Sequence, residues 1–377
     1  MALHTLPTPA RARELVAEHG APLLLLSTRQ AVRQYRALAA ALPGVDLHYA
    51  LKPLPHPAVV RALAAEGAWF DLATNGEVEV VRACGIPPAR CIQTHPIKRD
   101  GDIRHCLDFG VETFVFDNPF ELPKFLPYKD RARLLMRLSF RNKDAQCDLS
   151  LKFGVQPADA LDLLKKAVGM GLRVEGLSFH CGSQLLSNQK YLEAIGFCRQ
   201  LFSLAALDGI VLRTLDIGGG FPVPYTEAVT PIAEYCAPIA KLLESSFPGV
   251  RIIAEPGRFI AAPSMTLVAS VMGKSERQGR MWYYLDDGLY GSWSGKLYDH
   301  CDYPVVPISR DGRTLGGERL SVVAGPTCDS IDVVYQDLML PELEPGDLMV
   351  SPMMGAYTWA SATDFNFFPK ATIIVVD

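Results

Sequence analysis

The sequence predicts an α/β fold, a (β/α)8 barrel followed by an all-β domain. Eight short apolar segments alternate with helical patterns between about residues 46 and 255. Such alternation indicates parallel βαβ units, and eight strands close a barrel; a doubly wound open sheet is the alternative. After about residue 260 the strand-like segments are separated by turns. With 377 residues, 49% of them hydrophobic, the chain is long enough for two such domains.

The individual elements follow from hydrophobic periodicity. We expect a helix at 9–19, a strand at 22–26 that could belong to either domain, and a helix at 28–42. The expected barrel strands are 46–51, 69–73, 90–94, 112–117, 133–140, 174–180, 212–217 and 250–255. The expected helices between them are 57–66, 76–84, 100–109, 157–170, 186–206 and 230–246. The expected strands of the β domain are 262–275, 281–286, 319–324, 347–351 and 371–376.

Composition and charge argue against several classes of protein. A net charge of -4 gives no reason to expect nucleic acid or an anionic membrane as partner. Nine cysteines without a CxxC pair argue against structural disulfides and a zinc site, so no metal is expected and the cytoplasm is the expected compartment. The N-terminus has no apolar core of signal-peptide length, and no apolar run approaches the ~18 residues of a membrane span.

Lys52 is the residue around which the expected chemistry is organised. Val45, Leu47, Tyr49 and Leu51 share one face of a short strand, Lys52 closes it, and the prolines of PLPHP forbid its continuation. A lysine at the end of a buried strand loses hydration, its pKa falls, and the free amine can form a Schiff base. A merely solvated lysine is the alternative when this residue is considered alone.

Polar residues stand at the ends of other expected strands as well. They are Asp71, Thr94, His95, Arg137, His180, Asp216 and Glu255. The carboxyl ends of parallel barrel strands meet at one mouth, where the chemistry of such barrels collects. Ordinary turn and cap positions would carry mainly Ser, Asn, Asp and Gly, so these residue types favour a functional site.

The segments around Asp216 and Glu255 offer a suitable binding site for a phosphorylated aldehyde. The glycines 218–220 of DIGGGFP let successive N–H groups turn towards an anion, and Arg258 of AEPGRF supplies a second phosphate clamp. Glu255 would keep a pyridine nitrogen protonated, and His180 would lie against the ring. Each motif alone is also an ordinary turn, but together with Lys52 they predict pyridoxal 5'-phosphate as cofactor.

Eight stretches carry a resemblance to a known family. They are YALKPLPHPAVVRALAAEGAWFDLATNGEVEVV, SLKFGV, GLSFHCGSQ, LDIGGGFP, AEPGRF, LDDGLYGSWSGKLYDH, AGPTCDSIDVV and GAYTWASATDFNFF, in family order over nearly the whole chain. In them the chain resembles the fold-type III pyridoxal-phosphate decarboxylases of the ornithine, diaminopimelate and arginine decarboxylase group, and ornithine decarboxylase most. The resemblance implies a TIM-like, alanine-racemase-like barrel at 27–260 and a β domain made of 1–26 and 261–377.

The resemblance also implies a role for each site residue. Lys52 is implied to hold the cofactor as a Schiff base, His180 to stack on its ring and Glu255 to meet the pyridine nitrogen. Asp71, with Glu77, matches acidic positions near that lysine. The other cofactor-binding residues implied are Arg137, Ser183, Gly218, Gly219, Gly220, Gly257, Arg258 and Tyr357.

The loop GPTCDS is implied to complete the active site of a partner subunit. There Cys328 acts as the proton donor after carbon dioxide leaves, Asp329 meets the distal amine of the substrate, and Asp287 is a second acidic contact. Two carboxylates favour a cationic diamino acid over a diacid. Because the loop is donated in trans, a homodimer with shared active sites is the expected unit. Without the resemblance, a Cys-Asp pair in a turn would be interpreted as a buried thiol next to a capping residue.

The expected reaction is the decarboxylation of a basic diamino acid, first of all L-ornithine to putrescine in polyamine biosynthesis. Lysine, diaminobutyrate, arginine and intermediates of siderophore or antibiotic pathways stay open as substrates, because Leu54 stands where the family commonly has asparagine and Phe367 where glycine is usual. Alanine-racemase-like chemistry is a second alternative, against which the Cys-Asp loop argues. A non-catalytic, antizyme-inhibitor-like homologue is a third, against which the complete set of site residues argues.

Overall fold

The computed structural model describes residues 6–141 and 151–377. The chain divides into two compact units, which we call the barrel unit and the β unit. The barrel unit consists of Val32–Val223 and Val229–Ile260, and the β unit of Met1–Ala31, Pro224–Ala228 and Ala261–Asp377. The domain division expected from the sequence, 27–260 against 1–26 with 261–377, stays a proposal; the compact units differ from it at residues 27–31 and 224–228.

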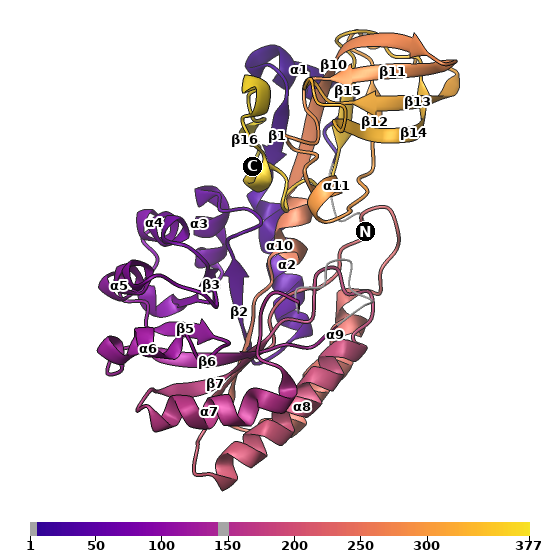
Figure 1. Ribbon diagram of the computed structural model, residues 1–377. Coiled ribbons are helices and arrows are strands. Elements are labelled where there is room, and N and C mark those ends of the chain that lie inside the picture. Colours follow the sequence, from indigo (N-terminus) through magenta and orange to yellow (C-terminus); the bar gives the residue numbers. More distant parts are fainter. Residues whose placement is uncertain (1–5, 142–150) are drawn as a thin grey trace. The chain divides into compact units, whose positions relative to one another are not determined.

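Eight parallel strands of the barrel unit form a closed barrel (Figure 1). They are β2 (Val45–Ala50), β3 (Trp69–Leu72), β4 (Cys91–Gln93), β5 (Thr113–Phe116), β6 (Arg133–Leu138), β7 (Val174–Phe179), β8 (Thr214–Asp216) and β9 (Arg251–Ala254). The predicted (β/α)8 barrel is confirmed, and the open sheet is wrong, because the first strand also pairs in parallel with the last, with Val45 opposite Ile252.

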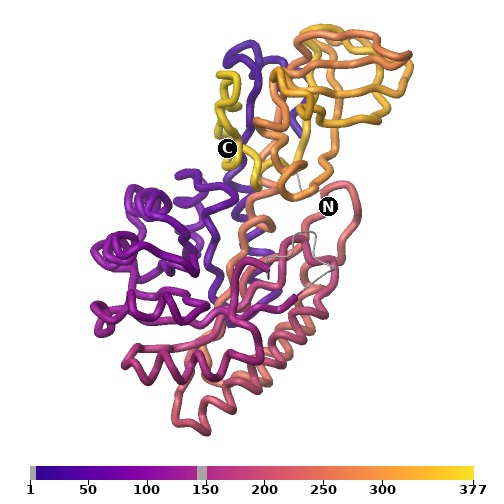
Figure 2. Tube along the Cα trace, in the orientation of Figure 1, coloured from indigo at the N-terminus to yellow at the C-terminus, as the bar shows by residue number. Residues whose placement is uncertain are grey.

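Helices alternate with these strands along the chain. They are α2 (Thr28–Ala41), α3 (Pro57–Ala65), α4 (Asn75–Ala83), α5 (Asp100–Phe109), α6 (Leu122–Phe125), α7 (Ala160–Gly169), α8 (Gln189–Leu207), α9 (Ile232–Ser246) and α10 (Arg258–Ala261). Local sequence sets their ends: Thr74 and Glu77 form a capping box at the start of α4, and Gly110 ends α5 at a φ of 106°. The long helices α8 and α9 lie side by side (Figures 1 and 2).

Large apolar side chains from the strands fill the barrel unit. Phe70, Phe114, Phe116 and Phe179 are each at most 1% exposed. Parallel strands covered by helices are buried on both faces, and burial of one such side chain contributes about 1.5–3 kcal/mol. This packing holds the backbone of each strand, and with it the polar residue at its carboxyl end.

The β unit contains an eight-stranded sheet. Its strands are β1 (Leu23–Leu26), β10 (Met265–Arg277), β11 (Arg280–Leu285), β12 (Val306–Ile308), β13 (Glu318–Ala324), β14 (Val333–Pro341), β15 (Leu348–Ser351) and β16 (Thr372–Val375). Two helices, α1 (Pro9–His19) and α11 (Gly295–Tyr298), belong to the same unit. The strands β12 and β14 were not predicted, and residues 262–264 form a 3-10 turn ahead of β10.

Both ends of the chain meet in this sheet. The four leucines of β1 are buried, and β1 pairs antiparallel with β10 and parallel with β16. Figure 2 shows the indigo N-terminal segment beside the yellow C-terminal segment. The strand at 22–26, which the sequence left open between the domains, therefore belongs to the β sheet.

The eight cysteines within 6–141 and 151–377 are free thiols. None of the helices in these ranges is both long and apolar enough to cross a membrane. No group of three or more His, Cys, Asp or Glu side chains in them is arranged to hold a metal ion.

Candidate active site

A chain of three polar side chains joins three consecutive strand ends of the barrel. Lys52 follows β2, and its Nζ lies 3.3 Å from Oδ2 of Asp71 at the end of β3. The other oxygen of Asp71 accepts a hydrogen bond from the Thr94 hydroxyl, which follows β4. Asp71 is 2% exposed, so this carboxylate is held by both neighbours within the barrel mouth. The predicted proximity of these strand ends is confirmed.

The burial predicted for the lysine amine is wrong. The Lys52 side chain is 40% exposed, whereas Leu51, Pro53 and Leu54 on either side are buried. The turn is closed by a 2.9 Å hydrogen bond from Leu54 N–H to the Leu51 carbonyl, which turns the buried residues inward and leaves Lys52 at the mouth. An ion pair with Asp71 at 3.3 Å therefore helps to hold this partly exposed amine at the mouth.

Two carboxyl groups, the fully buried Asp216 and the half-buried Glu255, stand at the ends of β8 and β9. Burial raises the pKa of Asp216 to about 6. Burial, followed by the nearby charges of Asp216 and Asp71, raises the pKa of Glu255 well above its usual range. Each carboxylate in such a site disfavours ionisation of the other, so the pair favours a state in which one of the two groups keeps its proton.

Arg137 and His180 line one pocket together with Thr94 and Glu255. Arg137 is half-buried, and its buried Nε has no hydrogen-bond partner among the residues that the structure describes. Burial lowers the pKa of His180 well below its usual range, and the charges of Arg137 and Lys52 lower it further. Gly182 N–H donates to Nδ1 of this histidine at 3.1 Å, so the ring is neutral and presents Nε2–H.

The glycines after β8 pack where no side chain fits. A Cβ on Gly218 would lie 2.3 Å from the Phe179 carbonyl oxygen, on Gly219 2.4 Å from that of Glu255, and on Gly220 2.2 Å from that of Gly182. Only glycine lets this turn approach the ends of β7 and β9 so closely. The resulting concave backbone, with Arg258 Nε bonded to Ser183 Oγ at 3.1 Å, suits an anionic group such as a phosphate.

Gly257 and Glu77 serve the same mouth indirectly. A Cβ on Gly257 would lie 2.8 Å from Cγ of Pro53, so this glycine lets β9 pack against the turn that carries Lys52. The Glu77 carboxylate accepts from the N–H groups of Ala73 and Thr74, at 2.5 and 3.1 Å, and so caps α4. The structure therefore shows Glu77 as a helix cap close to Asp71.

The predicted proton donor and amine contact lie on a turn of the β unit, between β13 and β14. Cys328 is exposed, and its N–H donates to Oδ1 of Asn366 at 2.9 Å. The Asp329 carboxylate accepts from the hydroxyl of Tyr290 at 2.5 Å and from Ile331 N–H at 3.1 Å. The first of these bonds holds the pKa of Asp329 below its usual range.

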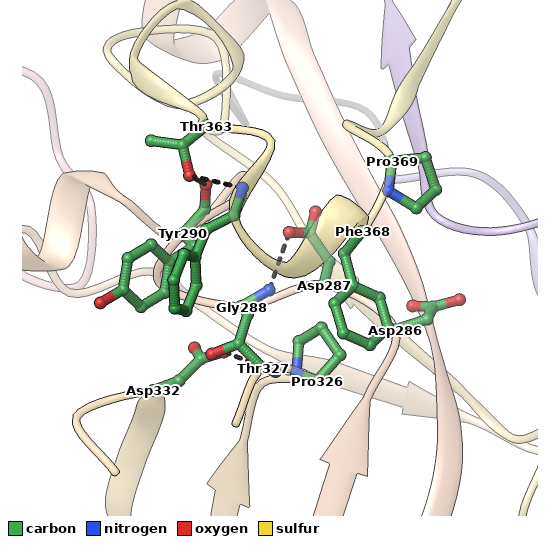
Figure 3. A pocket seen from close by; sticks show the side chains of 12 residues that line it. Asp286, Asp287, Gly288, Tyr290, Pro326, Thr327, Asp332, Thr363, Phe368 and Pro369 are labelled. Atoms are coloured by element: carbon green, nitrogen blue, oxygen red, sulfur yellow. Dashed lines mark hydrogen bonds between the residues drawn. The ribbon is translucent and has the colours of Figure 1, made fainter. Parts of the chain in front are cut away.

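An acidic pocket of the β unit borders this turn. It is lined by Asp286, Asp287, Asp332, Tyr290, Phe365 and Phe368, among others, and Figure 3 shows the three acids around Gly288. Oδ1 of Asp287 accepts from Gly288 and Ser292 N–H, both at 2.8 Å, while Oδ2 has no partner among the described residues. Asp287 is buried, and burial raises its pKa to about 6. Its predicted contact with a substrate amine stays a prediction.

Three residues near Cys328 and Asp329 were missed by the sequence reasoning. They are Tyr290, Asp332 and Asn366. Tyr290 and Asn366 contact the turn from 39 and 38 positions away in the sequence, whereas Asp332 lies close to the turn in sequence and accepts a hydrogen bond from Thr327. Each stands in a stretch that carries the family resemblance (LDDGLYGS, GPTCDSID and TDFNFF), so those stretches were the signal that could have found them. Tyr357 also lies in the β unit, at a φ of 55°.

Comparisons with known proteins agree with this geometry. The family model described as "Pyridoxal-dependent decarboxylase, pyridoxal binding domain" matches residues 28–262. The lysine/ornithine decarboxylase of Selenomonas ruminantium is 38% identical over 94% of this chain and 90% of its own length. The ornithine decarboxylase of Rattus norvegicus is 35% identical over 89% of this chain and 76% of its own length. The crystal structure of Vibrio vulnificus lysine/ornithine decarboxylase complexed with putrescine has a TM-score of 0.92 and 51% identity, with 99% of both chains covered.

The family match includes every strand of the barrel and the residues at its mouth. The relatives are similar along nearly the full chain, the β unit included. This protein therefore belongs to the pyridoxal-dependent decarboxylases, enzymes whose cofactor is pyridoxal phosphate.

Proposed function

We propose that this enzyme decarboxylates a basic diamino acid, L-ornithine in the first place, and that it acts as a cytoplasmic homodimer. The observation that carries the proposal is the joint presence of Lys52, Asp71, His180 and Glu255 at one mouth of the barrel. The pKa of Glu255 responds to the charges of both Asp71 and Lys52, which means that the three groups lie close enough to interact.

The mouth of the barrel fits pyridoxal phosphate in its chemistry. When bound, this cofactor supplies an electron sink that weakens the bond to the substrate carboxylate. Lys52 is the amine that holds it, with Asp71 keeping that amine in place. The backbone of Gly218, Gly219 and Gly220, with Ser183, Arg258 and Tyr357, is the proposed phosphate site; Arg137 and Gly257 complete the cofactor set.

Two residues would govern the cofactor ring. Burial raises the pKa of Glu255, so its carboxyl group favours the protonated form and would share that proton with the pyridine nitrogen. His180, neutral because of burial and two nearby cations, can pack flat on the ring without a competing positive charge.

The turn of Cys328 and Asp329 supports both the dimer and the choice of a cationic substrate. The exposed thiol of Cys328 is available as a proton donor, and its loop is available to the active site of a second copy of the chain. The Asp329 carboxylate stays ionised, because its hydrogen bond to Tyr290 lowers its pKa. An ionised carboxylate beside the proton donor selects a substrate with a second ammonium group.

Lysine is the second candidate substrate, because two of the relatives are named lysine/ornithine decarboxylase. Ornithine is placed first since the rat relative is named ornithine decarboxylase alone, whereas the Vibrio vulnificus enzyme was solved both with putrescine and with cadaverine and so favours neither substrate. The two substrates differ by one methylene, a difference worth only about tenfold to 200-fold in an apolar pocket. Both activities in one enzyme are therefore compatible with the site.

The proposal is tested by carbon dioxide release from cofactor-loaded enzyme over L-ornithine, L-lysine, L-arginine, L-2,4-diaminobutyrate and meso-diaminopimelate. We expect turnover of ornithine, with lysine next, and none above background for the Lys52→Ala control. A preference for meso-diaminopimelate would contradict the amine-reading role of Asp329. Silence on the whole panel, with the lysine–cofactor linkage visible by absorbance, would overturn the substrate class but leave the decarboxylase family intact.

A further inference from the structure

Tyr290 makes the shortest contact to the turn that carries the proposed catalytic thiol. Its hydroxyl donates to Oδ2 of Asp329 at 2.5 Å, while Ile331 N–H donates to Oδ1 at 3.1 Å. Each donor binds a different oxygen of the Asp329 carboxylate, so the two bonds together restrain rotation of this carboxylate. The bond to the carboxylate also raises the pKa of Tyr290 to about 12, which keeps the phenol a donor.

Tyr290 is itself held in place on three sides. Its ring stacks on Phe365, with centroids 4.5 Å apart and planes at 28°. Its carbonyl oxygen accepts from Thr363 N–H at 2.8 Å and from the Thr363 hydroxyl at 3.3 Å, the bonds dashed in Figure 3. The preceding Leu289 donates its N–H to Oδ1 of Asp332 at 2.7 Å. A ring fixed in this way presents its hydroxyl without further loss of side-chain entropy.

Asp332 ties the same segment to the turn from the other end. Its Oδ2 accepts from the N–H and the hydroxyl of Thr327, at 3.1 and 2.7 Å, and its N–H donates to the Asp329 carbonyl at 3.1 Å. A Cβ on Gly288 or Gly325 would lie 2.4 or 2.2 Å from Oδ1 of Asp332, so the two glycines leave room for the Asp332 carboxylate beside the turn. Through Asp332, the segment that carries Tyr290 and the turn that carries Asp329 are therefore joined by hydrogen bonds.

We propose that Tyr290 is a positioning residue that aims the Asp329 carboxylate at the distal ammonium group of the substrate and thereby sets selectivity for diamino acids. This inference rests on the proposed function, in which Asp329 contacts the substrate amine, and adds the residue that orients Asp329. A carboxylate restrained by two donors keeps its remaining lone pairs in fixed directions, so an ammonium group meets a prepared acceptor. A carboxylate free to rotate would have to be ordered by each substrate that binds.

The test is the Tyr290→Phe variant of the full-length, cofactor-loaded enzyme. Phenylalanine keeps the stack on Phe365 and the backbone contacts of Thr363, and removes only the hydroxyl. We expect KM for L-ornithine to rise about tenfold with kcat within about twofold, the size expected for one hydrogen bond to a charged group. Binding of putrescine, measured by titration calorimetry, should weaken by a similar factor, whereas binding of butylamine, which has no distal amine, should not change.

The matched control is Tyr335→Phe. Tyr335 belongs to the same unit, and its hydroxyl donates to the carbonyl of Tyr303 at 2.6 Å, away from the Cys328 turn. This variant should lower the melting temperature without changing KM for ornithine or the ratio of putrescine to butylamine binding. A rise in KM with Tyr335→Phe as large as that with Tyr290→Phe would show that the effect is one of general stability, and would overturn the proposal.

A double-mutant cycle with Asp329→Asn separates this inference from the proposed function. If Tyr290 acts through Asp329, Tyr290→Phe should change KM by less than about twofold in the Asp329→Asn background. If Asp329→Asn raises KM but Tyr290→Phe does not, the positioning role is wrong and the proposed function stands. If Asp329→Asn leaves KM and putrescine binding unchanged, the amine-reading role of Asp329 fails, and the positioning proposal fails with it.

Discussion

Asp216 and Glu255 form a buried pair in the barrel mouth in which one carboxyl group governs the protonation of the other. Oδ2 of Asp216 is buried and has no hydrogen-bond partner among the described residues. A proton on Glu255 supplies a donor: contact with Asp216 raises the pKa of Glu255, and the same contact lowers that of Asp216. Burial and the charge of Asp216 thus favour the protonated form of Glu255, the residue proposed to face the pyridine nitrogen.

Asp216→Asn should change the pH dependence of cofactor binding. The amide removes a negative charge and can donate an N–H to Glu255, so the pKa of Glu255 falls. Glu255 is then ionised at lower pH, and the acidic limb of the profile of pyridoxal phosphate affinity against pH should move down by about one unit. Equilibrium dialysis across a pH series measures this. The control is Asp46→Asn at the start of β2, whose carboxylate pairs with Arg251 at 2.7 Å; a similar shift there would refute the explanation.

Gly219→Ala should weaken cofactor binding with the fold preserved. Its Cβ would lie 2.4 Å from the Glu255 carbonyl oxygen, a backbone atom that cannot move aside, so the glycine turn must shift. We expect the dissociation constant of pyridoxal phosphate to rise tenfold or more, about 1.4 kcal/mol.

The control for this change is Gly101→Ala in α5. Nothing lies within 4 Å of a Cβ at that position. It should leave cofactor affinity unchanged and stabilise the helix by about 0.5–1 kcal/mol. Equal losses of affinity in the two variants would contradict the cradle assigned to residues 218–220.

Asp286→Asn should stabilise the protein at neutral and alkaline pH. Burial raises the pKa of Asp286 to about 7, so the folded state keeps its proton up to a higher pH than the unfolded state does. As the pH rises from about 4 to about 7, only the unfolded state gains from ionisation, and the free energy of unfolding falls. The asparagine variant escapes this loss while its side-chain oxygen can still accept from Ser270 N–H.

Urea unfolding of this variant and the wild type at pH 5 and pH 8 measures the effect. The advantage of the variant should grow between the two pH values, by on the order of 1–2 kcal/mol, because Asp286 keeps some contact with solvent. Asp337→Asn, at an exposed carboxylate paired with Arg280, should show no such growth. A constant difference at both pH values would show that ionisation of Asp286 is not its cause.

Asn366→Gly and Phe367→Gly should separate a positioning effect from backbone strain. Both residues have positive φ, 54° and 59°, so glycine relieves about 1 kcal/mol of strain at Phe367 and less at Asn366, because asparagine tolerates this region better. Phe367 is 97% exposed, and its replacement removes little packing. Asn366→Gly also removes the acceptor of Cys328 N–H.

We therefore expect both variants to be at least as stable as the wild type in thermal unfolding, and only Asn366→Gly to lose kcat, by about tenfold. A loss in Phe367→Gly alone would instead assign the positioning role to the aromatic side chain, at the position where the family usually has glycine. A loss in neither would mean that the turn holds Cys328 without help.

The periodicity of the sequence was sufficient for the barrel and for its mouth. Eight buried strands alternate with helices at the predicted ranges, and a closed parallel barrel has only one carboxyl end. Lys52, Asp71 and Glu255 therefore had to share that mouth once their strands were identified. The local sequence pattern is enough to predict this mouth, because the position of each polar residue follows from the strand that it ends.

The β unit and the electrostatics were decided by tertiary structure alone. The parallel pairing of β1 with β16, the contact of Tyr290 with Asp329 and that of Asn366 with Cys328 each join segments at least 38 residues apart. Local periodicity does not specify which distant segments pair or in which register. The exposure of Lys52 and the shared proton of Asp216 and Glu255 were likewise hidden in the sequence, because desolvation depends on every group that surrounds a side chain in space.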